Sequence, residues 1–355
     1  MNLIKKNTVI SDRHMLGWWQ GTDMVIGHWG TGLIDDFGKE APEGVNLERY
    51  YSDPNTVVRR EHDRIMAKSF PLDIQSIAIP DINTLPLALY LGAKPTFTSS
   101  NIWYDHSDLS PENDYPLCFD KDNRWFRSHM EIYKKMMQIS GGRYQVGLPA
   151  LVPNLDVLAE LRGVQDLLMD MILDPGWVHE KLKELNQVFF EVYEEFQPLL
   201  IDEKGWTSQG YFMVRGPGKI ALTHCDTAAM IGTQMFNDFV VPYLREQCDY
   251  LDYSIYHVDG PDAIRSIDPL LEIESLTALE FTPGPQIPPG GDPYWYEMYQ
   301  KIKKAGKSVQ AVWIRPEEVV PLLDAVGPQG MYLMVFIDTL KQAERLEREV
   351  ESYYS

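Results

Sequence analysis

Short apolar segments alternate with amphipathic segments along the second half of the chain, and this alternation constrains the fold more than any other feature. The apolar segments predict strands at 219–226, 253–260, 276–284, 308–316 and 331–337. The amphipathic segments predict helices at 233–251, 260–273, 293–307, 316–330 and 339–355. Parallel neighbouring strands need a crossover connection, which is usually a helix. Five such units in succession predict a parallel sheet and favour a closed (β/α)₈ TIM barrel over an open sheet.

The first half of the chain is less regular. Residues 74–83 and 144–151 predict strands, and residues 179–200 predict a long helix. Residues 1–70 are rich in Trp, Tyr, Asp and Gly, and we interpret them as an N-terminal cap with loops. No repeat or long Ser/Gly linker marks a domain boundary. The simplest interpretation is one barrel domain over residues 1–355, with an elaborated N-terminal segment.

Charge excludes several classes of partner. The chain has 32 Lys and Arg residues and 52 Asp and Glu residues, so its net charge is −20. This charge repels nucleic acid and anionic membranes. The sequence has no apolar run of about 18 residues and no signal-peptide core, so we expect a cytoplasmic protein that does not cross a membrane. Gly216, Pro217 and Gly218 follow a predicted strand but lack the spacing of a nucleotide-binding motif, so no nucleotide cofactor is expected.

Polar and aromatic residues follow the predicted strands. In parallel barrels the chemistry lies at the carboxyl ends of the strands, so residues distant in sequence meet at one rim. A small-molecule substrate is expected there. The residues predicted at this rim are Asp81, Asn83, Cys225, Asp226, His257, Asp259, Glu280, Trp313 and Arg315.

Three of these residues have side chains that bind zinc. Cys225, His257 and Glu280 end three successive predicted strands, and a thiolate, an imidazole and a carboxylate could hold zinc with a fourth position open. The alternative is that Cys225 is a buried thiol and that Glu280 pairs with Arg315. The chain's three cysteines, Cys118, Cys225 and Cys248, are too few and too far apart for a disulfide framework.

His257 and Asp259 are also candidates for general acid–base catalysis. Residues two apart on a strand share a face while the strand continues, so Asp259 could tune the imidazole of His257. Gly260 and Pro261 follow directly. In the alternative interpretation Asp259 caps the helix that begins near Pro261.

Aromatic residues in predicted loops suggest a lid over the pocket. We predict that at least two of Trp18, Trp19, Trp103 and Trp313 line the pocket mouth, and that Asp81, Asn83 and Asp226 contact the substrate. The alternative for the N-terminal aromatic segment is a plug at the bottom of the barrel. An aromatic-rich surface is also compatible with a homodimer.

Three segments carry a family resemblance. Residues 161–182 ("LRGVQDLLMDMILDPGWVHEKL"), 235–247 ("MFNDFVVPYLREQ") and 256–273 ("YHVDGPDAIRSIDPLLEI") together resemble the uroporphyrinogen decarboxylase superfamily. The resemblance covers roughly residues 140–340. The resemblance implies a (β/α)₈ barrel. The superfamily includes zinc-dependent methyltransferases that move methyl groups between corrinoid proteins and a thiol or pterin.

The sequence departs from both known branches of that superfamily. The decarboxylases resemble one another in an arginine-rich N-terminal segment. In this chain the corresponding stretch after Arg13 is "HMLGWWQGTDMVIG", which contains no arginine. The methyltransferases that activate coenzyme M have an H-x-C motif and a later cysteine. Here His257 matches the histidine, Asp259 replaces the cysteine, and no cysteine follows Cys248.

The resemblance favours a methyltransferase that acts on a small molecule, with a corrinoid protein as partner and zinc as cofactor. Two alternatives stay open. In one, His257 and Asp259 act without metal in a decarboxylase or lyase. In the other, the chain is a non-catalytic paralogue that only binds a small molecule.

Overall fold

The centre of the molecule is a parallel six-stranded sheet. A computed structural model describes residues 4–28, 40–83 and 85–354. The strand order is β1-β12-β11-β10-β9-β8, and every neighbouring pair is parallel. The strands are β1 (Val25–His28), β8 (Ile220–Thr223), β9 (Tyr253–Asp259), β10 (Ala278–Thr282), β11 (Ser308–Ile314) and β12 (Met331–Val335). The five strands predicted in the second half are confirmed.

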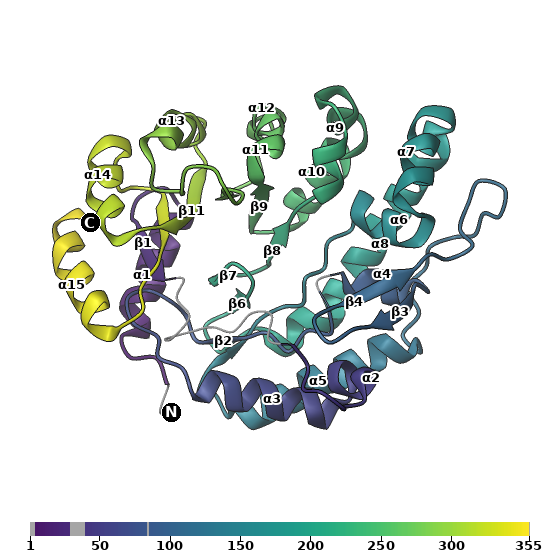
Figure 1. The fold of residues 1–355 in the computed structure, drawn as a ribbon, viewed down its shortest axis with the longest axis horizontal. Helices are drawn as coiled ribbons and strands as arrows, with labels where there is room; N and C mark the ends of the chain where they lie inside the picture. The colour runs from purple at the N-terminus through teal and green to yellow at the C-terminus, as the bar shows by residue number, and fades with distance from the viewer. Residues whose placement is uncertain (1–3, 29–39, 84, 355) are drawn as a thin grey trace.

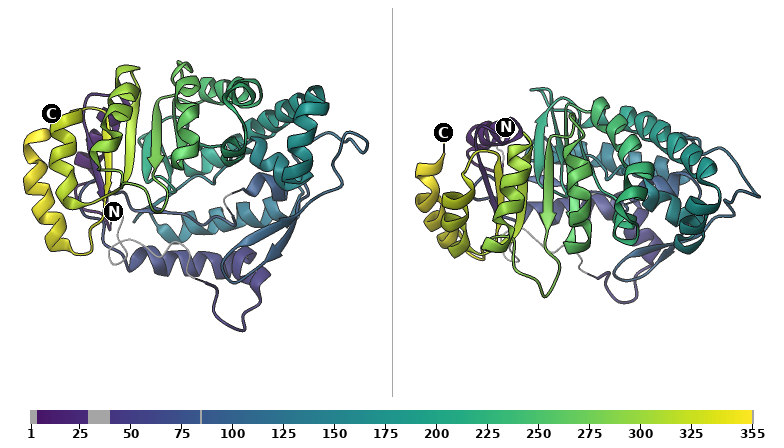
Figure 2. Two further views of the ribbon diagram at one scale, coloured as in Figure 1. Left: turned by 45° about the horizontal axis from the view of Figure 1, so that its top comes forward. Right: turned by 90° about the horizontal axis from the view of Figure 1, so that it is seen from above.

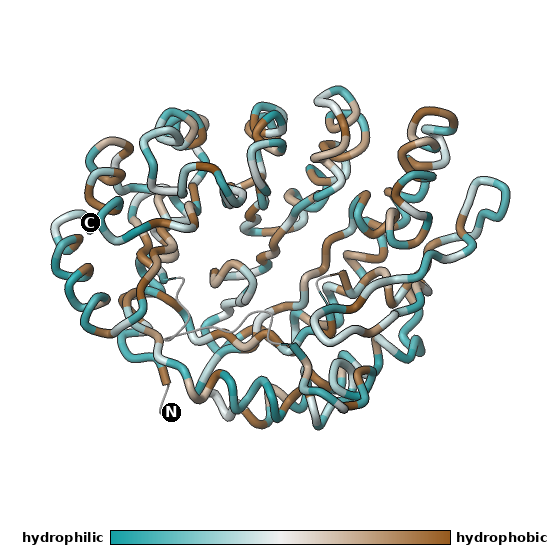
Figure 3. The backbone as a smooth tube through the Cα atoms, in the orientation of Figure 1, coloured by the Kyte–Doolittle hydropathy of each residue, from teal (hydrophilic) through white to brown (hydrophobic). Residues whose placement is uncertain are grey.

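Helices cover the outer side of this sheet (Figures 1 and 2). The second half contributes α9 (Thr233–Phe239), α10 (Val241–Tyr250), α11 (Gly260–Ala263), α12 (Ile267–Leu271), α13 (Tyr296–Lys304), α14 (Pro316–Val326) and α15 (Leu340–Val350). The helix predicted at 233–251 is divided at Val240, because Pro242 supplies no backbone N–H and fits best in a first helical turn. Figure 3 shows apolar residues concentrated on the central strands and on parts of the helices.

Alternate residues along each strand face two different apolar clusters, as the twofold period of a strand requires. On β9, Ile255 packs in the inner cluster with Val25, Ile220 and Leu222. Tyr256 packs in the outer cluster, beneath the helices. Residues of one parity on a strand therefore face the interior of the fold, and residues of the other parity face the helix layer.

Two further strands form a separate parallel pair, β2 (Ile77–Ala78) with β5 (Gln145–Val146). The backbone N–H of Asp73 donates to Ile26 O on β1, and Leu148 bridges Gln209 in parallel. The described residues thus contain eight parallel strands in two sheets, joined in part by these contacts.

The first half adds helices and two antiparallel hairpins. The helices are α1 (Thr8–Trp19), α2 (Leu47–Ser52), α3 (Pro54–Met66), α4 (Pro86–Tyr90), α5 (Arg124–Ser140), α6 (Leu155–Arg162), α7 (Val164–Leu173) and α8 (Pro175–Leu200). The hairpins are β3 (Lys94–Phe97) with β4 (Ile102–Asp105), and β6 (Trp206–Gln209) with β7 (Val214–Pro217). The long helix predicted at 179–200 is confirmed within α8.

The N-terminal segment is more than a cap with loops. β1 pairs with β12 inside the central sheet, with Val25 level with Tyr332. The interpretation of residues 1–70 as a cap is wrong for this part, because Val25–His28 belongs to the central sheet. Its apolar run is only Val25 and Ile26 before Gly27, which gives no clear strand pattern. Residues 1–3 and 29–39 of the segment lie outside the described residues. Over the part of the chain that the structure covers, no helix is both long and apolar enough to traverse a lipid bilayer.

Candidate functional site

Three polar side chains form one row across the carboxyl ends of β8, β9 and β10. His257 is level with Glu280 in the sheet register. Thr223 is level with Tyr256, so His224, the next residue, follows in step with His257. All three have the parity of the inner cluster, which includes Leu222, Ile255 and Ala278. The row therefore faces the interior of the fold.

His257 and Glu280 are hydrogen-bonded to each other through Nδ1 of the imidazole and Oε2 of the carboxylate. Glu280 is only 1% exposed, and its Oε1 accepts a hydrogen bond from Thr282 Oγ1 at 2.5 Å. Burial alone lowers the pKa of His257, but the Glu280 carboxylate raises it by more, so the net shift is upward. The other ring nitrogen, Nε2, lies 3.9 Å from Asp259 Oδ1. Glu280 therefore orients the imidazole and leaves Nε2 for another partner.

Asp259 does not cap the following helix with its side chain. It occupies the N-cap position of α11 but makes no side-chain capping hydrogen bond. The alternative interpretation placed Asp259 correctly before this helix, but its side chain does not form the capping hydrogen bond. Arg315 lies 3.8 Å from Glu318, and the partner of Glu280 is His257.

His224 lies between two carboxylates. Its Nδ1 is 3.2 Å from Asp156 Oδ2, on α6, and 3.5 Å from Asp226 Oδ1. Burial alone lowers the pKa of His224, but the ion pairs with Asp156 and Asp226 raise it to about 10. Burial alone raises the pKa of Asp156, but His224 and the hydrogen bonds from Thr227 lower it to about 2. Without a bound ligand, His224 is therefore protonated and Asp156 is ionised at neutral pH.

The two histidines face each other. Their ring centroids are 6.4 Å apart in a T-shaped arrangement. Among the residues that the structure describes, Asp156, His224 and Asp226 form a group whose ligating atoms all lie within 4.8 Å of one another, close enough for a metal ion. Sequence reasoning missed His224 and Asp156. The signal for His224 was present, because it has the same strand parity as His257.

Cys225 does not join His257 and Glu280. It belongs to the outer apolar cluster with Phe236 and Tyr256, and its Sγ lies 4.0 Å from Asp156 Oδ1. Burial and the nearby Asp156 carboxylate raise the pKa of the thiol well above its usual range. The prediction of Cys225 as a ligand beside His257 is wrong in this structure, because adjacent residues of an extended chain face opposite sides.

Asp81 lies after β2 and contacts residues of three other segments of the chain. Its Oδ2 accepts hydrogen bonds from Ala150 N at 2.9 Å and from Tyr211 Oη at 3.3 Å. Its Oδ1 lies 2.8 Å from Nε2 of the fully buried His129, on α5. Nδ1 of His129 lies 2.5 Å from Tyr90 Oη. Sequence reasoning missed His129, since a histidine within an amphipathic helix gives no separate signal.

The tip of the β6–β7 hairpin separates Asp81 from His257. Tyr211 in this tip contacts Asp81, and the ring of the adjacent Phe212 lies 5.5 Å from the ring of His257. The carbonyl oxygen of Phe212 accepts a hydrogen bond from Gln310 Nε2 at 2.8 Å. On β12, Tyr332 Oη donates to Met213 O at 3.1 Å. Inward-facing residues of β11 and β12 therefore hold the hairpin tip in place between the two polar groups.

The four tryptophans predicted at the pocket mouth lie in different places. Trp18 and Trp19 are buried on α1 at the amino-terminal ends of the strands. Trp18 Nε1 donates to Val309 O near the start of β11, and the ring of Trp19 lies 5.2 Å from that of Tyr253 at the start of β9. Trp18 and Trp19 therefore do not line the mouth, and the plug is the interpretation that fits them. The prediction of at least two tryptophans at the mouth then depends on Trp103 and Trp313.

Trp103, Trp313 and Asn83 complete the predicted set. Trp103 is 62% exposed on β4. Trp313 lies near the carboxyl end of β11, where the register with β12 shifts, and has a φ of 58°. A positive φ is costly for a bulky residue, and such strain clusters at functional sites. Asn83 Nδ2 donates to Ile102 O at 3.0 Å, which links the loop after β2 to β4.

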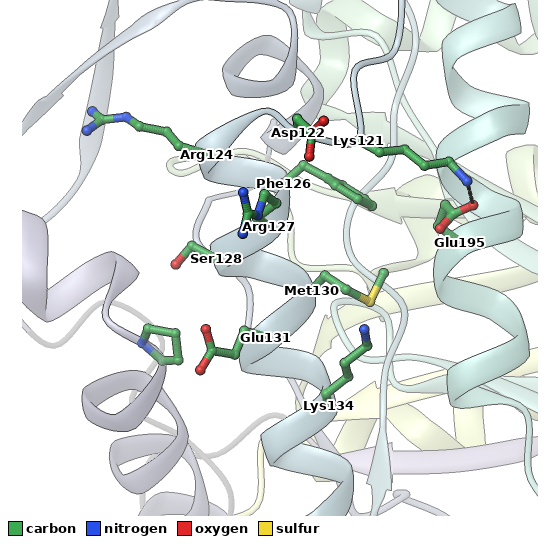
Figure 4. Close-up of a pocket in the computed structure, with 11 residues that line it drawn as sticks. Lys121, Asp122, Arg124, Phe126, Arg127, Ser128, Met130, Glu131, Lys134 and Glu195 are labelled. Atoms are coloured by element: carbon green, nitrogen blue, oxygen red, sulfur yellow. Dashed lines mark hydrogen bonds and ion pairs between the residues drawn. The ribbon is translucent and has the colours of Figure 1, made fainter.

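Another concave region lies on the outer helix α5. It is a groove of about 650 Å³ whose lining includes Lys121, Arg124, Arg127, Lys134, Asp122, Glu131 and Glu195 (Figure 4). Lys121 forms an ion pair with Glu195 of α8. The side chains carry both signs of charge and are mostly exposed, so this groove is typical of a solvated surface.

The fold is similar to that of a methyltransferase from Methanosarcina mazei. The TM-score is 0.63 at 10% sequence identity, and the similarity covers 97% of this chain and 99% of that protein. No protein-family model and no curated protein matches the sequence. At 10% identity the similarity shows a shared fold over nearly the whole chain.

Proposed function

We propose that the chain is an enzyme that transfers a methyl group to or from a small molecule, built on a single uroporphyrinogen decarboxylase-like (β/α)₈ barrel domain. The observation that carries the proposal is the row of His224, His257 and Glu280 at the carboxyl ends of three neighbouring parallel strands. This is the end at which parallel barrels place their catalytic groups. The structural similarity to a methyltransferase over 97% of the chain favours methyl transfer among the chemistries that this fold supports.

A barrel is favoured by the eight parallel strands and by the links between the two sheets. Asp73 N bonds to Ile26 O beside β1, and Leu148 bridges Gln209 beyond β5. The hairpin tip at Tyr211 and Phe212 then fills the interior beneath the site. In this interpretation the buried Asp81 holds the hairpin tip through Tyr211, and the tip lies between Asp81 and His257.

Zinc, which the family resemblance implies, fits the site only in part. The thiolate does not fit, because Cys225 faces the helix layer. His257 does fit, because its Nδ1 is bound by the buried Glu280 and its Nε2 is left available. A metal ion at His257 would act as a Lewis acid that lowers the pKa of an acceptor thiol or of water. Glu280 would orient and polarise the imidazole, and Asp259 would be the nearest exposed carboxylate to accept a proton.

The proposed partners follow from the same resemblance. A corrinoid protein would supply or receive the methyl group, and a thiol or a reduced pterin would be the small-molecule acceptor. The test uses free methylcob(III)alamin as methyl donor with coenzyme M, and separately with a reduced pterin. We expect loss of the methylcobalamin absorbance and formation of the methylated acceptor, both reduced about 100-fold or more in His257→Ala.

Cys225→Ser is the matched control, because its side chain lies outside the row and the variant should transfer methyl groups at the wild-type rate. Wild-type protein that transfers no methyl group to either acceptor, but releases carbon dioxide from a carboxylated substrate without metal, would overturn the proposal in favour of the decarboxylase alternative.

A further inference from the structure

The row of polar side chains that contains His257 and Glu280 continues onto β11. Gln310 is level with Glu280 in the sheet register and is only 1% exposed. Its Nε2 donates to the carbonyl oxygen of Phe212, whereas its Oε1 has no hydrogen-bond partner among the residues that the structure describes. Leaving a buried acceptor unpaired is costly. The interior beside the row therefore suits a ligand that brings a hydrogen-bond donor.

Two carboxylates flank the histidines of the row. Asp226 and Asp259 each follow their histidine by two residues, and their side chains are 65% and 58% exposed. Within the described part of the chain, each forms an ion pair with its own histidine and with no lysine or arginine. Both carboxylates are therefore accessible to a ligand with a positive charge.

The net charge of the site is negative. Four carboxylates surround the two histidines, which supply at most two positive charges; these carboxylates are Asp156, Asp226, Asp259 and Glu280. A divalent ion at His257 would require a neutral imidazole there. The positive charges would then number three, still fewer than the four negative charges. With or without metal, the site attracts small cations and repels small anions.

Two aromatic rings border the same interior. The register of β11 with β12 shifts near the carboxyl end, and Val312 and the next residue, Trp313, both pack with the inner cluster. Trp313 and Phe212 are only partly buried there, so part of each ring is open. The ring of Phe212 lies 5.5 Å from the ring of His257. Faces of aromatic rings attract ammonium groups, and those of tryptophan do so most strongly.

We propose that the small molecule bound at this site is an aminothiol, a thiol that carries an ammonium group. Asp226 and Asp259 provide the counter-charges for the ammonium, and the open faces of Phe212 and Trp313 receive it. Gln310 Oε1 accepts one of its hydrogen bonds. This inference rests on the proposed function for the location of the site and for the choice of a thiol as methyl acceptor, and adds the charge of that thiol.

The test compares three thiols that share a two-carbon chain and differ in charge at neutral pH: cysteamine (positive), 2-mercaptoethanol (neutral) and coenzyme M (negative). Titration calorimetry of the full chain after chelator treatment measures their affinities. We expect cysteamine to bind at least about 10-fold more tightly than 2-mercaptoethanol, and coenzyme M to bind most weakly. In the methyl-transfer assay, kcat/KM should follow the same order.

Two sets of variants locate the preference. Asp226→Asn with Asp259→Asn should bring the affinities for cysteamine and 2-mercaptoethanol to within about 2-fold of each other, because the counter-charges are removed. Trp313→Leu should weaken cysteamine binding by about 5- to 10-fold and leave 2-mercaptoethanol binding unchanged.

Matched controls are Asp63→Asn with Asp166→Asn, which change two aspartates of similar exposure elsewhere, and Trp103→Leu, which changes an exposed tryptophan on β4. Both controls should bind as the wild type does.

Equal affinity for cysteamine and 2-mercaptoethanol overturns the proposal. So does a preference for cysteamine that survives both the double aspartate variant and Trp313→Leu. The proposed function fails separately. A preference for cysteamine without methyl transfer would contradict the proposed function and leave the ligand class standing, whereas equally efficient transfer to all three thiols would support methyl transfer and overturn this inference.

Discussion

Glu280 is buried in the interior of the fold and is hydrogen-bonded to Nδ1 of His257 on the neighbouring strand. This relationship assigns different roles to the two ring nitrogens. Nδ1 faces a fixed carboxylate, and Nε2 faces the exposed Asp259. The site is therefore organised around a histidine whose orientation is set by the protein and whose outer nitrogen is free to bind.

Replacing Glu280 by Gln should weaken zinc binding by about 10- to 100-fold without abolishing it. Gln keeps the shape of the side chain but removes the charge that makes the imidazole a better ligand. Titration calorimetry of the metal-free variant gives the affinity, with Glu297→Gln on the exposed face of α13 as the control. Unchanged affinity in Glu280→Gln would mean that His257 is not a ligand.

His129 and Asp81 should be coupled in folding stability. Removing His129 leaves Oδ1 of the buried Asp81 carboxylate without its imidazole neighbour, while Oδ2 keeps its bonds from Ala150 and Tyr211, so His129→Leu should cost about 1–3 kcal/mol. The double variant with Asp81→Asn should recover part of that loss. Urea denaturation of the four proteins in this cycle measures the coupling. Simple additivity of the two single changes would show that the pair does not interact.

Trp18 should matter for stability and not for binding. Its ring is fully buried at the amino-terminal ends of the strands, and its indole N–H bonds to Val309 O. Trp18→Ala should therefore lower the free energy of unfolding by about 3–5 kcal/mol. Metal affinity measured on the fraction that stays folded should equal that of the wild type. A large loss of metal affinity would instead indicate that Trp18 lines the pocket.

His28 should make the folded state sensitive to acid. It is buried at the end of β1, and neither ring nitrogen has a hydrogen-bond partner among the described residues. Burial, and to a lesser degree the charge of Lys5, lower its pKa to about 4 from an unfolded value of about 6.5. The unfolded chain therefore binds the proton first. The stability that His28 contributes is complete above pH 6.5 and is lost as the pH falls to 4.

The size of this loss is about 3 kcal/mol for one group, at 1.36 kcal/mol per pH unit. Denaturant titrations between pH 4 and pH 7 should show it in the wild type, and His28→Leu should show a flatter dependence. An identical pH dependence in both proteins would contradict the assignment to His28.

The three cysteines should differ in reactivity. Cys118 is exposed, whereas Cys225 and Cys248 are buried with thiol pKa values raised by burial. A disulfide reagent should therefore modify one thiol quickly in the native protein and the other two only after denaturation. Rapid native modification of Cys225 would mean that it does not pack in the outer apolar cluster.

The sequence predicted the strand–helix order well, because buried parallel strands and amphipathic helices leave strong periodic patterns. β8 to β12 lie where the apolar segments placed them. β2 lies within the strand predicted at 74–83, whereas β1 was missed, because Gly27 interrupts the apolar run of Val25 and Ile26. β1 was recognised only through its pairing with β12.

At the site, His257 and Glu280 were predicted to be neighbours, and the register places them side by side. The error was one residue on the next strand, where Cys225 was chosen for its chemistry and His224 was passed over. A shift of one residue reverses the face of a strand, so the parity of Leu222 and His224 would have excluded Cys225. Asp156 and His129 lie on helices far away in sequence, and only the tertiary structure brings them to the strand ends.

The central claim is tested most directly by anomalous diffraction at the zinc edge from crystals of the zinc-loaded protein. The account predicts one strong peak at the carboxyl end of β9, about 2.0–2.1 Å from Nε2 of His257. A peak bound to Cys225, or no ordered zinc at the carboxyl end of this strand, would contradict it.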